Sequence, residues 1–225
     1  MKKCIKQVHS MSKTNTILFI FEGNRTEDQI FDNLKRYFAN QNTIVECAFC
    51  SDIYQLYNKI SADEDLDIFT ILKNRPQNVD LLSPYKRTDF AEIYMFFDYD
   101  GHVPIANDEK IKSLLKTFNE ETEFGKLFIS YPMVEAIKHL SPSIDFRNLK
   151  VKAKEKINYK KIVGAECDND FQNLKALSKE NWLEIIDCHL KKMNYLINDT
   201  YTLPTSYTPQ IDIFNKQLEK YINID

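Results

Sequence analysis

The feature that most constrains the fold is an alternation of short apolar runs with segments of helical periodicity. TILFIF (16–21), TIVECAF (43–49), EIYMFF (92–97) and KLFISY (126–131) each read as a strand, because they are short and rich in β-branched and aromatic residues. Apolar runs of this kind are typical of strands that are covered on both faces. Strands that alternate with helices therefore predict an α/β fold with a mostly parallel central sheet and helices on both faces.

The segments between these runs carry helix signals. Thr26 and Gln29 form a capping box, Ser51 or Asp52 suits the cap of a second helix, and Pro132 suits the first turn of another. Apolar residues recur at helical spacing after such starts. The sequence predicts helices over 26–38, 51–62, 106–121 and 132–140.

Composition divides the chain into two parts. Residues 13–142 carry the alternation of strands and helices, with a less regular stretch at 63–90 that we interpret as an insertion. Residues 143–225 begin with a basic stretch and continue in helical patterns, which predicts an α-helical C-terminal region packed against the α/β domain. The chain has only four glycines and no glycine-rich phosphate loop, so a Walker-type or Rossmann nucleotide site is not expected.

The overall charge gives the chain no general affinity for polyanions. Its 225 residues include 30 basic and 33 acidic side chains, a net charge of -3, so a nucleic-acid site would have to be local. No run approaches the roughly 18 apolar residues that a membrane helix needs, and MKKCIKQVHSMSK at the start lacks the apolar stretch of a signal peptide. We expect a soluble, cytoplasmic protein without a membrane partner.

The five cysteines are scattered and odd in number, which favours a reducing compartment. Cys47 and Cys50 have the CxxC spacing of a redox or zinc site. They end a strand-like run, however, and neither a second CxxC nor a histidine pair accompanies them. We favour the interpretation that they are buried strand cysteines.

Acidic residues follow three of the predicted strands. Asp98 and Asp100 stand at the end of 92–97, Glu22 follows 16–21, and Glu135 follows 126–131. Ligand sites in parallel sheets lie beyond the carboxyl ends of the strands, and carboxylates crowded there repel one another unless cations neutralise them. Oxygen ligands with few histidines favour Mg²⁺ or Mn²⁺, and two such ions are the usual device for displacement at phosphodiesters. The pattern indicates phosphoryl transfer or hydrolysis.

Each acid also has a purely structural interpretation. Glu27 lies in a first helical turn, where a carboxylate complements the helix dipole, and the same holds for Glu135. Asp98, Asp100 and Gly101 would equally suit an ordinary turn. The functional interpretation is favoured by the combination of a Glu-Gly after the first strand with an Asp-x-Asp after the third.

The stretches FIFEGNRTEDQIF, YMFFDYDGH and SYPMVEA resemble the Toprim domain, which is shared by topoisomerases, primases and OLD-type nucleases. Within that superfamily they resemble the small Toprim proteins of bacterial phage defence, the abortive-infection and RloB-like group. The resemblance covers about residues 16–140. It implies a Toprim-like Rossmannoid fold, Mg²⁺-dependent cleavage of nucleic acid, and a separate ATPase or defence-system protein as a partner.

The resemblance also assigns roles to residues. It makes Glu22 a general base or metal ligand, and Asp98 and Asp100 the Mg²⁺ ligands. Glu27 and Glu135 become candidates for a second metal site, although four residues separate Glu22 from Glu27, one more than in some relatives. Beside that resemblance, Lys138 lies one helical turn after Glu135, where it either stabilises a developing oxyanion or is simply solvated.

The stretch RNLKVKAKEKINYKK (147–161) carries seven basic residues and one acidic residue. Such a local excess of positive charge would anchor phosphates, whereas the alternative is a solvated helix face. The predicted nucleic-acid-binding residues are Arg147, Lys150, Lys152, Lys154, Lys156, Lys160 and Lys161.

Two functions follow from these observations. The first is a Mg²⁺-dependent nuclease that acts on DNA or RNA. The second is a non-catalytic module that uses the same fold to bind nucleic acid or a partner protein as a sensor or regulator. Binding of a divalent cation at the predicted carboxylates distinguishes the two.

Overall fold

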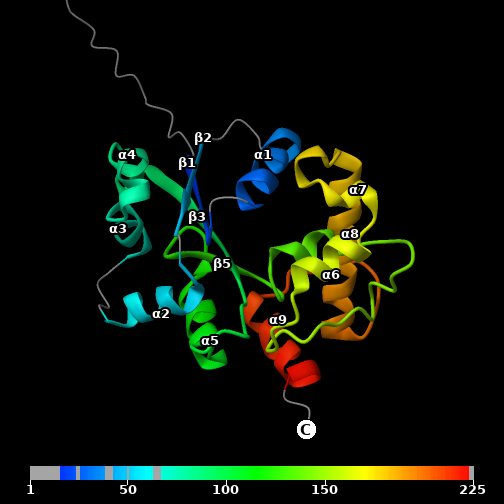
Figure 1. The fold of residues 1–225 in the computed structure, drawn as a ribbon. Helices are drawn as coiled ribbons and strands as arrows, with labels where there is room; N and C mark the ends of the chain where they lie inside the picture. The colour runs from blue at the N-terminus through cyan, green and yellow to red at the C-terminus, as the bar shows by residue number, and fades with distance from the viewer. Residues whose placement is uncertain (1–15, 24–25, 39–42, 50, 63–66, 223–225) are drawn as a thin grey trace, which may run out of the picture.

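The computed structural model describes residues 16–23, 26–38, 43–49, 51–62 and 67–222. Within these ranges the chain forms a five-stranded sheet in the order β2-β1-β3-β5-β4 (Figure 1). The strands β1 (Thr16–Phe21), β2 (Thr43–Ala48), β3 (Phe90–Asp98) and β5 (Gly125–Ser130) are parallel, and the short β4 (Asn119–Glu120) is antiparallel to β5. The four strands predicted from the sequence, and their parallel arrangement, are confirmed.

Helices lie on both faces of the sheet, as expected (Figure 1). One face carries α2 (Ile53–Ala62), α3 (Ile68–Lys73), α4 (Val79–Leu82) and α5 (Asp108–Thr117). The other side of the molecule carries α1 (Thr26–Phe38), α6 (Tyr159–Glu166), α7 (Asn169–Gln172) and α8 (Lys179–Asn198), while α9 (Gln210–Gln217) contacts α5, α8 and β5. Short 3₁₀ helices occur at Pro76–Asn78, Arg87–Asp89, Val134–Lys138 and Leu174–Ala176, and a π-helical turn at Leu218–Ile222.

Side chains of the central strands alternate between the two faces. Leu18 and Met95 are fully buried in the main core, on the face that α2 and α5 cover. On the other face Phe19 and Phe96 stack with their ring centroids 5.8 Å apart, and Phe31 of α1 lies 4.4 Å from the Phe19 ring. Both faces of the sheet are therefore apolar, which explains the continuous apolar runs in the sequence.

The C-terminal region contributes to both sides of this sheet. Phe214 and Leu218 belong to the main core, together with residues of the central strands. Trp182 of α8 packs into a second core with Ile30 of α1. The helices after residue 143 are thus joined to the α/β part by shared apolar cores.

The described part of the predicted insertion is also built into the main core. Ile68, Leu72 and Leu82 have exposed fractions of 2%, 0% and 0%. Asp67 caps α3, because its side chain accepts a hydrogen bond from the Thr70 amide at 2.9 Å. This stretch is therefore packed against the sheet as part of the main core.

Two predicted helices differ from the observed structure. The helix predicted over 106–121 ends at Thr117, because the buried Phe118 leaves helical geometry (φ −104°, ψ 66°) and the chain turns into β4. The helix predicted over 132–140 is the 3₁₀ helix η3 (Val134–Lys138). Pro132 precedes η3 instead of opening it, because Met133 is extended (φ −159°, ψ 175°).

None of the helices in the described ranges is long and apolar enough to cross a membrane.

Candidate functional site at the carboxyl edge of the sheet

The carboxyl ends of β1 and β3 form the switch point of the sheet. The chain passes from β1 to β2 on one side and then crosses to β3 on the other side of β1. Ligands of open parallel sheets bind in the crevice at such a point. The pairing extends past the end of β1, since the Glu22 amide donates a hydrogen bond to the Phe96 carbonyl at 3.1 Å.

Glu22 and Asp98 are adjacent at this point. Glu22 Oε2 accepts a hydrogen bond from the Asp98 amide at 2.9 Å. Asp98 Oδ1 accepts a hydrogen bond from the amide of Val134, the first residue of η3, at 2.9 Å. The two carboxylates therefore hold the ends of β1 and β3 and the start of η3 together, at the one edge where the sequence predicted that the acids would meet.

Asp100 lies in a tight turn after β3. Its φ of 44° is in the left-handed region, which aspartate and asparagine enter more readily than most residues. Its Oδ1 lies 3.9 Å from Nδ1 of His102. A Cβ atom at Gly101 would lie 2.8 Å from Cζ of Tyr99, whose ring is 1% exposed and cannot move aside. The turn therefore requires glycine at this position.

A pocket of about 410 Å³ brings predicted acids and predicted basic residues together. Asp98, Asp100 and Glu135 line it, as do residues of the basic stretch. Glu135 is only 4% exposed, and its Oε1 lies 2.8 Å from Nζ of Lys160. The lysines that line this acidic pocket are Lys152, Lys156 and Lys160.

Negative charge is crowded in the acidic pocket. Burial raises the pKa of the Asp100 carboxyl, the Asp52 and Glu135 carboxylates raise it further, and His102 lowers it. Sequence analysis assigned Asp52 only the role of a helix cap, which it does fill by accepting a hydrogen bond from the Gln55 amide at 2.9 Å. Asp52 follows β2 much as Glu22 follows β1. The criterion that selected Glu22 and Asp98, an acid just after a predicted strand, would therefore have selected Asp52 as well.

The basic stretch is largely irregular. Before α6 begins at Tyr159, residues 147–158 run through turns and coil, so for them the alternative of a solvated helix face is wrong. Beyond the three lysines of the pocket, the predicted basic residues lie elsewhere. Lys154 pairs with Asp108 at 2.6 Å, Arg147 and Lys150 lie over the rings of Tyr195 and Tyr221, and Lys161 is exposed on α6.

Several other predicted residues lie apart from the pocket or outside the description. Lys138 Nζ donates a hydrogen bond to the Gln172 carbonyl at 3.4 Å, and Lys138 is not among the residues that line the pocket. Glu27 lies in α1, but its side chain is outside the described residues, as are those of Cys47 and Cys50.

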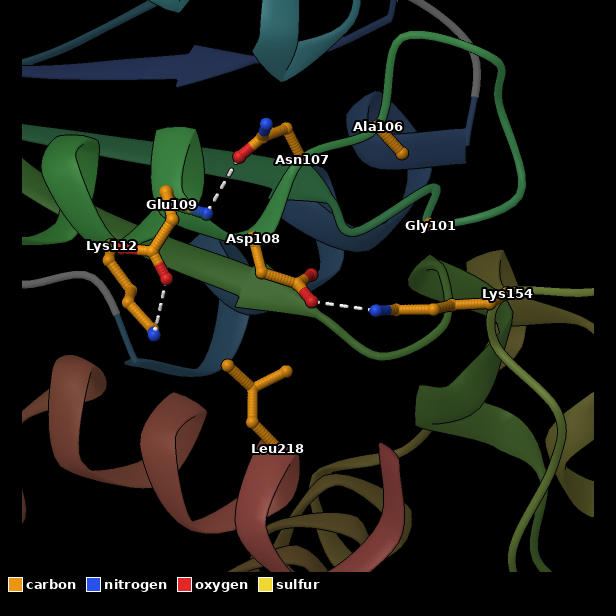
Figure 2. A pocket seen from close by; sticks show the side chains of 8 residues that line it. All are labelled: Gly101, Ala106, Asn107, Asp108, Glu109, Lys112, Lys154 and Leu218. Carbon is orange, nitrogen blue, oxygen red and sulfur yellow. Dashed lines mark hydrogen bonds and ion pairs between the residues drawn. The ribbon is translucent and has the colours of Figure 1, made fainter. Parts of the chain in front are cut away.

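A second hollow, of about 370 Å³, lies beside the start of α5 (Figure 2). Its Asp108 accepts a hydrogen bond from the Tyr99 hydroxyl at 2.6 Å and pairs with Lys154 at 2.6 Å. Its Glu109 pairs with Lys112 at 2.7 Å. The acids of this hollow are thus paired with lysines, as Glu135 is in the acidic pocket.

The described residues of the acidic pocket do not offer a complete protein cage for a metal ion. No three histidine, cysteine, aspartate or glutamate side chains in the described ranges converge closely enough to hold one ion. Mg²⁺ usually takes one or two carboxylates and completes its shell with waters and substrate phosphates. Asp98 and Asp100, two residues apart and in one pocket, supply carboxylates of that kind.

Comparison with family models, curated proteins and solved structures finds no match for this chain. Fold and site therefore define its class by themselves. It is a mixed α/β protein with a mostly parallel sheet, whose switch point carries an acidic pocket bordered by lysines.

Proposed function

We propose that the protein is a Mg²⁺- or Mn²⁺-dependent phosphodiesterase that cleaves nucleic acid. The observation that carries this proposal is the acidic pocket, where Asp98, Asp100 and Glu135 share one hollow with three lysines at the switch point of the sheet. Carboxylates that hold a cation and lysines that attract a phosphate are the two requirements of such chemistry. The resemblance to Toprim proteins extends the proposal to a Toprim-like fold and a role in bacterial anti-phage defence, with abortive infection as its outcome.

The residues divide the work by position. A bound cation would polarise the phosphate and lower the pKa of an attacking water. Asp98 and Asp100 would hold that cation, and Glu22 orients the end of β3 through its hydrogen bond to the Asp98 amide. Lys152 and Lys156 are exposed at the pocket and would contact phosphate groups of the DNA or RNA backbone.

The local charge supports nucleic acid as the substrate. The whole chain has a net charge of -3, but residues 147–161 hold seven basic residues against one acidic residue. Phosphate contacts release counterions, so we expect binding to weaken steeply as salt rises. Most of the affinity for nucleic acid should survive the loss of one carboxylate. The basic side chains supply that affinity, and a carboxylate repels phosphates.

Cleavage assays test the proposal. Single-stranded and duplex DNA and RNA are incubated with the protein in Mg²⁺, Mn²⁺, Ca²⁺ or EDTA, with and without the protein products of neighbouring genes as sources of an ATPase or defence partner. We expect cutting in Mg²⁺ or Mn²⁺ only. Asp100→Asn keeps a residue that suits the left-handed turn and should reduce cutting at least about 100-fold. Mutation of a residue that only hydrogen-bonds to a metal ligand already lowers activity about 10- to 100-fold, and loss of a ligand should cost at least as much.

Asp80→Asn is the matched control, because Asp80 is an exposed acid on α4, outside the acidic pocket, and its loss should leave cutting unchanged. The proposal is wrong if every substrate stays intact under all conditions and calorimetry detects no Mn²⁺ binding. The non-catalytic binding module would then be the better interpretation.

A further inference from the structure

The ion pair between Glu135 and Lys160 joins a buried acid to an exposed base. The side chain of Glu135 is 5% exposed and that of Lys160 is 71% exposed, and Nζ lies 2.8 Å from Oε1. Both residues line the acidic pocket with Asp98 and Asp100. A positive charge that belongs to the protein therefore sits beside Glu135, one of the four acidic residues that line the pocket together with Asp98, Asp100 and Glu155.

The fold holds this lysine in place through its neighbour. The Tyr159 hydroxyl lies 3.0 Å from Nδ1 of His139, and Nε2 of the same imidazole lies 3.0 Å from Glu166 Oε2. His139 is 1% exposed and directly follows η3, the 3₁₀ helix that contains Glu135. The buried contact between Tyr159 and His139 fastens the first turn of α6 to the end of η3, so that Lys160 and Glu135 face each other. The half-exposed Glu166, at the end of α6, holds the other nitrogen of the imidazole.

We propose that the ammonium of Lys160 takes the place of a second metal ion beside Glu135, so that the pocket accepts a single divalent cation, at Asp98 and Asp100. The inference rests on the proposed function and narrows it to a one-metal site. A carboxylate that is already paired with an ammonium is a poor ligand for a further cation, because binding would require the ion pair to break. An ammonium has three N–H donors, so Lys160 can stay paired and still donate to a phosphate oxygen.

The number of bound Mn²⁺ ions tests the inference without reference to activity. Mn²⁺ titrations of the full chain, followed by electron paramagnetic resonance and by calorimetry, should give one ion per wild-type chain. Lys160→Met should admit a second ion, because it leaves Glu135 without this ammonium. The double variant Lys160→Met/Glu135→Gln should return to one ion, and a spin coupling between two nearby Mn²⁺ ions should appear only in the single variant.

Two control variants separate charge from folding. Lys160→Arg keeps the positive charge and should still bind one ion. Lys161→Met removes the next lysine of α6, which is also exposed, and should also leave one ion. Circular dichroism melts confirm that each variant is folded before titration.

The outcomes distinguish this inference from the proposed function. Two Mn²⁺ ions in the wild type, or one in Lys160→Met, would overturn the inference while the metal-dependent function stands. The absence of any Mn²⁺ binding in the wild type would overturn both.

Discussion

Two regions of the molecule bury polar groups in opposite ways. Between α1 and α8, the side chain of Asn33 is 2% exposed and all its hydrogen-bonding groups are used. Its Nδ2 donates to the carbonyls of Leu174 and Lys175 at 3.1 and 3.0 Å, and its Oδ1 accepts from Nε1 of Trp182 at 3.1 Å. A buried amide satisfied in this way ties the C-terminal region to the α/β part.

The acidic pocket has the reverse character. Asp100 is crowded by Asp52 and Glu135, and burial with this crowding raises its pKa. Such an arrangement costs stability unless a ligand neutralises it. The difference separates two roles of polar groups. A satisfied buried group such as Asn33 supports the fold, whereas a carboxyl crowded by other carboxylates, such as that of Asp100, weakens it.

The largest effect on stability is expected where the satisfied network is broken. Asn33→Ala removes three hydrogen bonds and leaves buried partners unpaired, so it should lower the free energy of unfolding by about 4 kcal/mol. Urea denaturation measures the loss. Asn148→Ala is the matched control, because Asn148 is exposed and should change stability by less than about 0.5 kcal/mol. Equal losses of stability in the two variants would show that the buried network at Asn33 contributes no more than an exposed hydrogen bond.

The second prediction concerns pH and the same helical core. The imidazole pKa of His189 is lowered to about 4. Burial is the main cause and Lys192 adds to it, while hydrogen bonds to the backbone of Ile137 and Ala136 partly offset the lowering. In the unfolded chain the pKa is near 6.5, so the neutral imidazole favours folding above pH 6.5. That stability, about 3 kcal/mol, should be lost as pH falls from 6.5 to about 4.

Denaturant unfolding between pH 7 and pH 4 measures this loss. His189→Gln should flatten the slope in that window. A slope that persists in His189→Gln would assign the acid sensitivity to other groups.

The third prediction reverses the sign in the acidic pocket. In EDTA at pH 7, Asp100→Asn should raise the free energy of unfolding by about 1 kcal/mol, because it removes a crowded charge and keeps the left-handed turn. A raised carboxyl pKa means that wild-type stability rises as pH falls through that pKa, so the advantage of asparagine should vanish near pH 4. Thermal melts in EDTA measure both effects. A lower melting temperature for the variant at pH 7 would indicate that Asp100 is a structural turn residue.

The smallest effect is expected in the second hollow, where the charges are balanced. Asp108→Asn keeps an acceptor for the Tyr99 hydroxyl and loses only the ion pair with the half-exposed Lys154. It should lower stability by less than about 1 kcal/mol. Measured beside Asp100→Asn, it should therefore shift the melting temperature in the opposite direction. A higher melting temperature in both variants would show that the gain in stability comes from removing any negative charge, and not from relieving the crowding at Asp100.

Much of the sheet and of the acidic edge was predictable from the sequence. The runs at 16–21, 43–49, 92–97 and 126–131 are strands because both faces of the sheet are covered, and a continuous apolar run reports that condition directly. The carboxyl ends of parallel strands share one edge, so the acids after them had to lie near one another. Local signals were weaker at boundaries, as at Phe118, where a buried side chain ends a helix that its sequence would allow to continue.

Only the tertiary structure decided which charges meet. Sequence patterns report how buried each segment is, since burial follows from the period of apolar residues. They do not report which exposed residue of one segment faces which acid of another, because that depends on how the packed elements are oriented. The pairing of Lys160 with Glu135, of Lys154 with Asp108, and the approach of Asp52 to Asp100 all arise in this way. The positions of the acids were thus predictable from the sequence pattern. The pairing of Glu135 and Asp108 with lysines depended on how the C-terminal region packs against the α/β part.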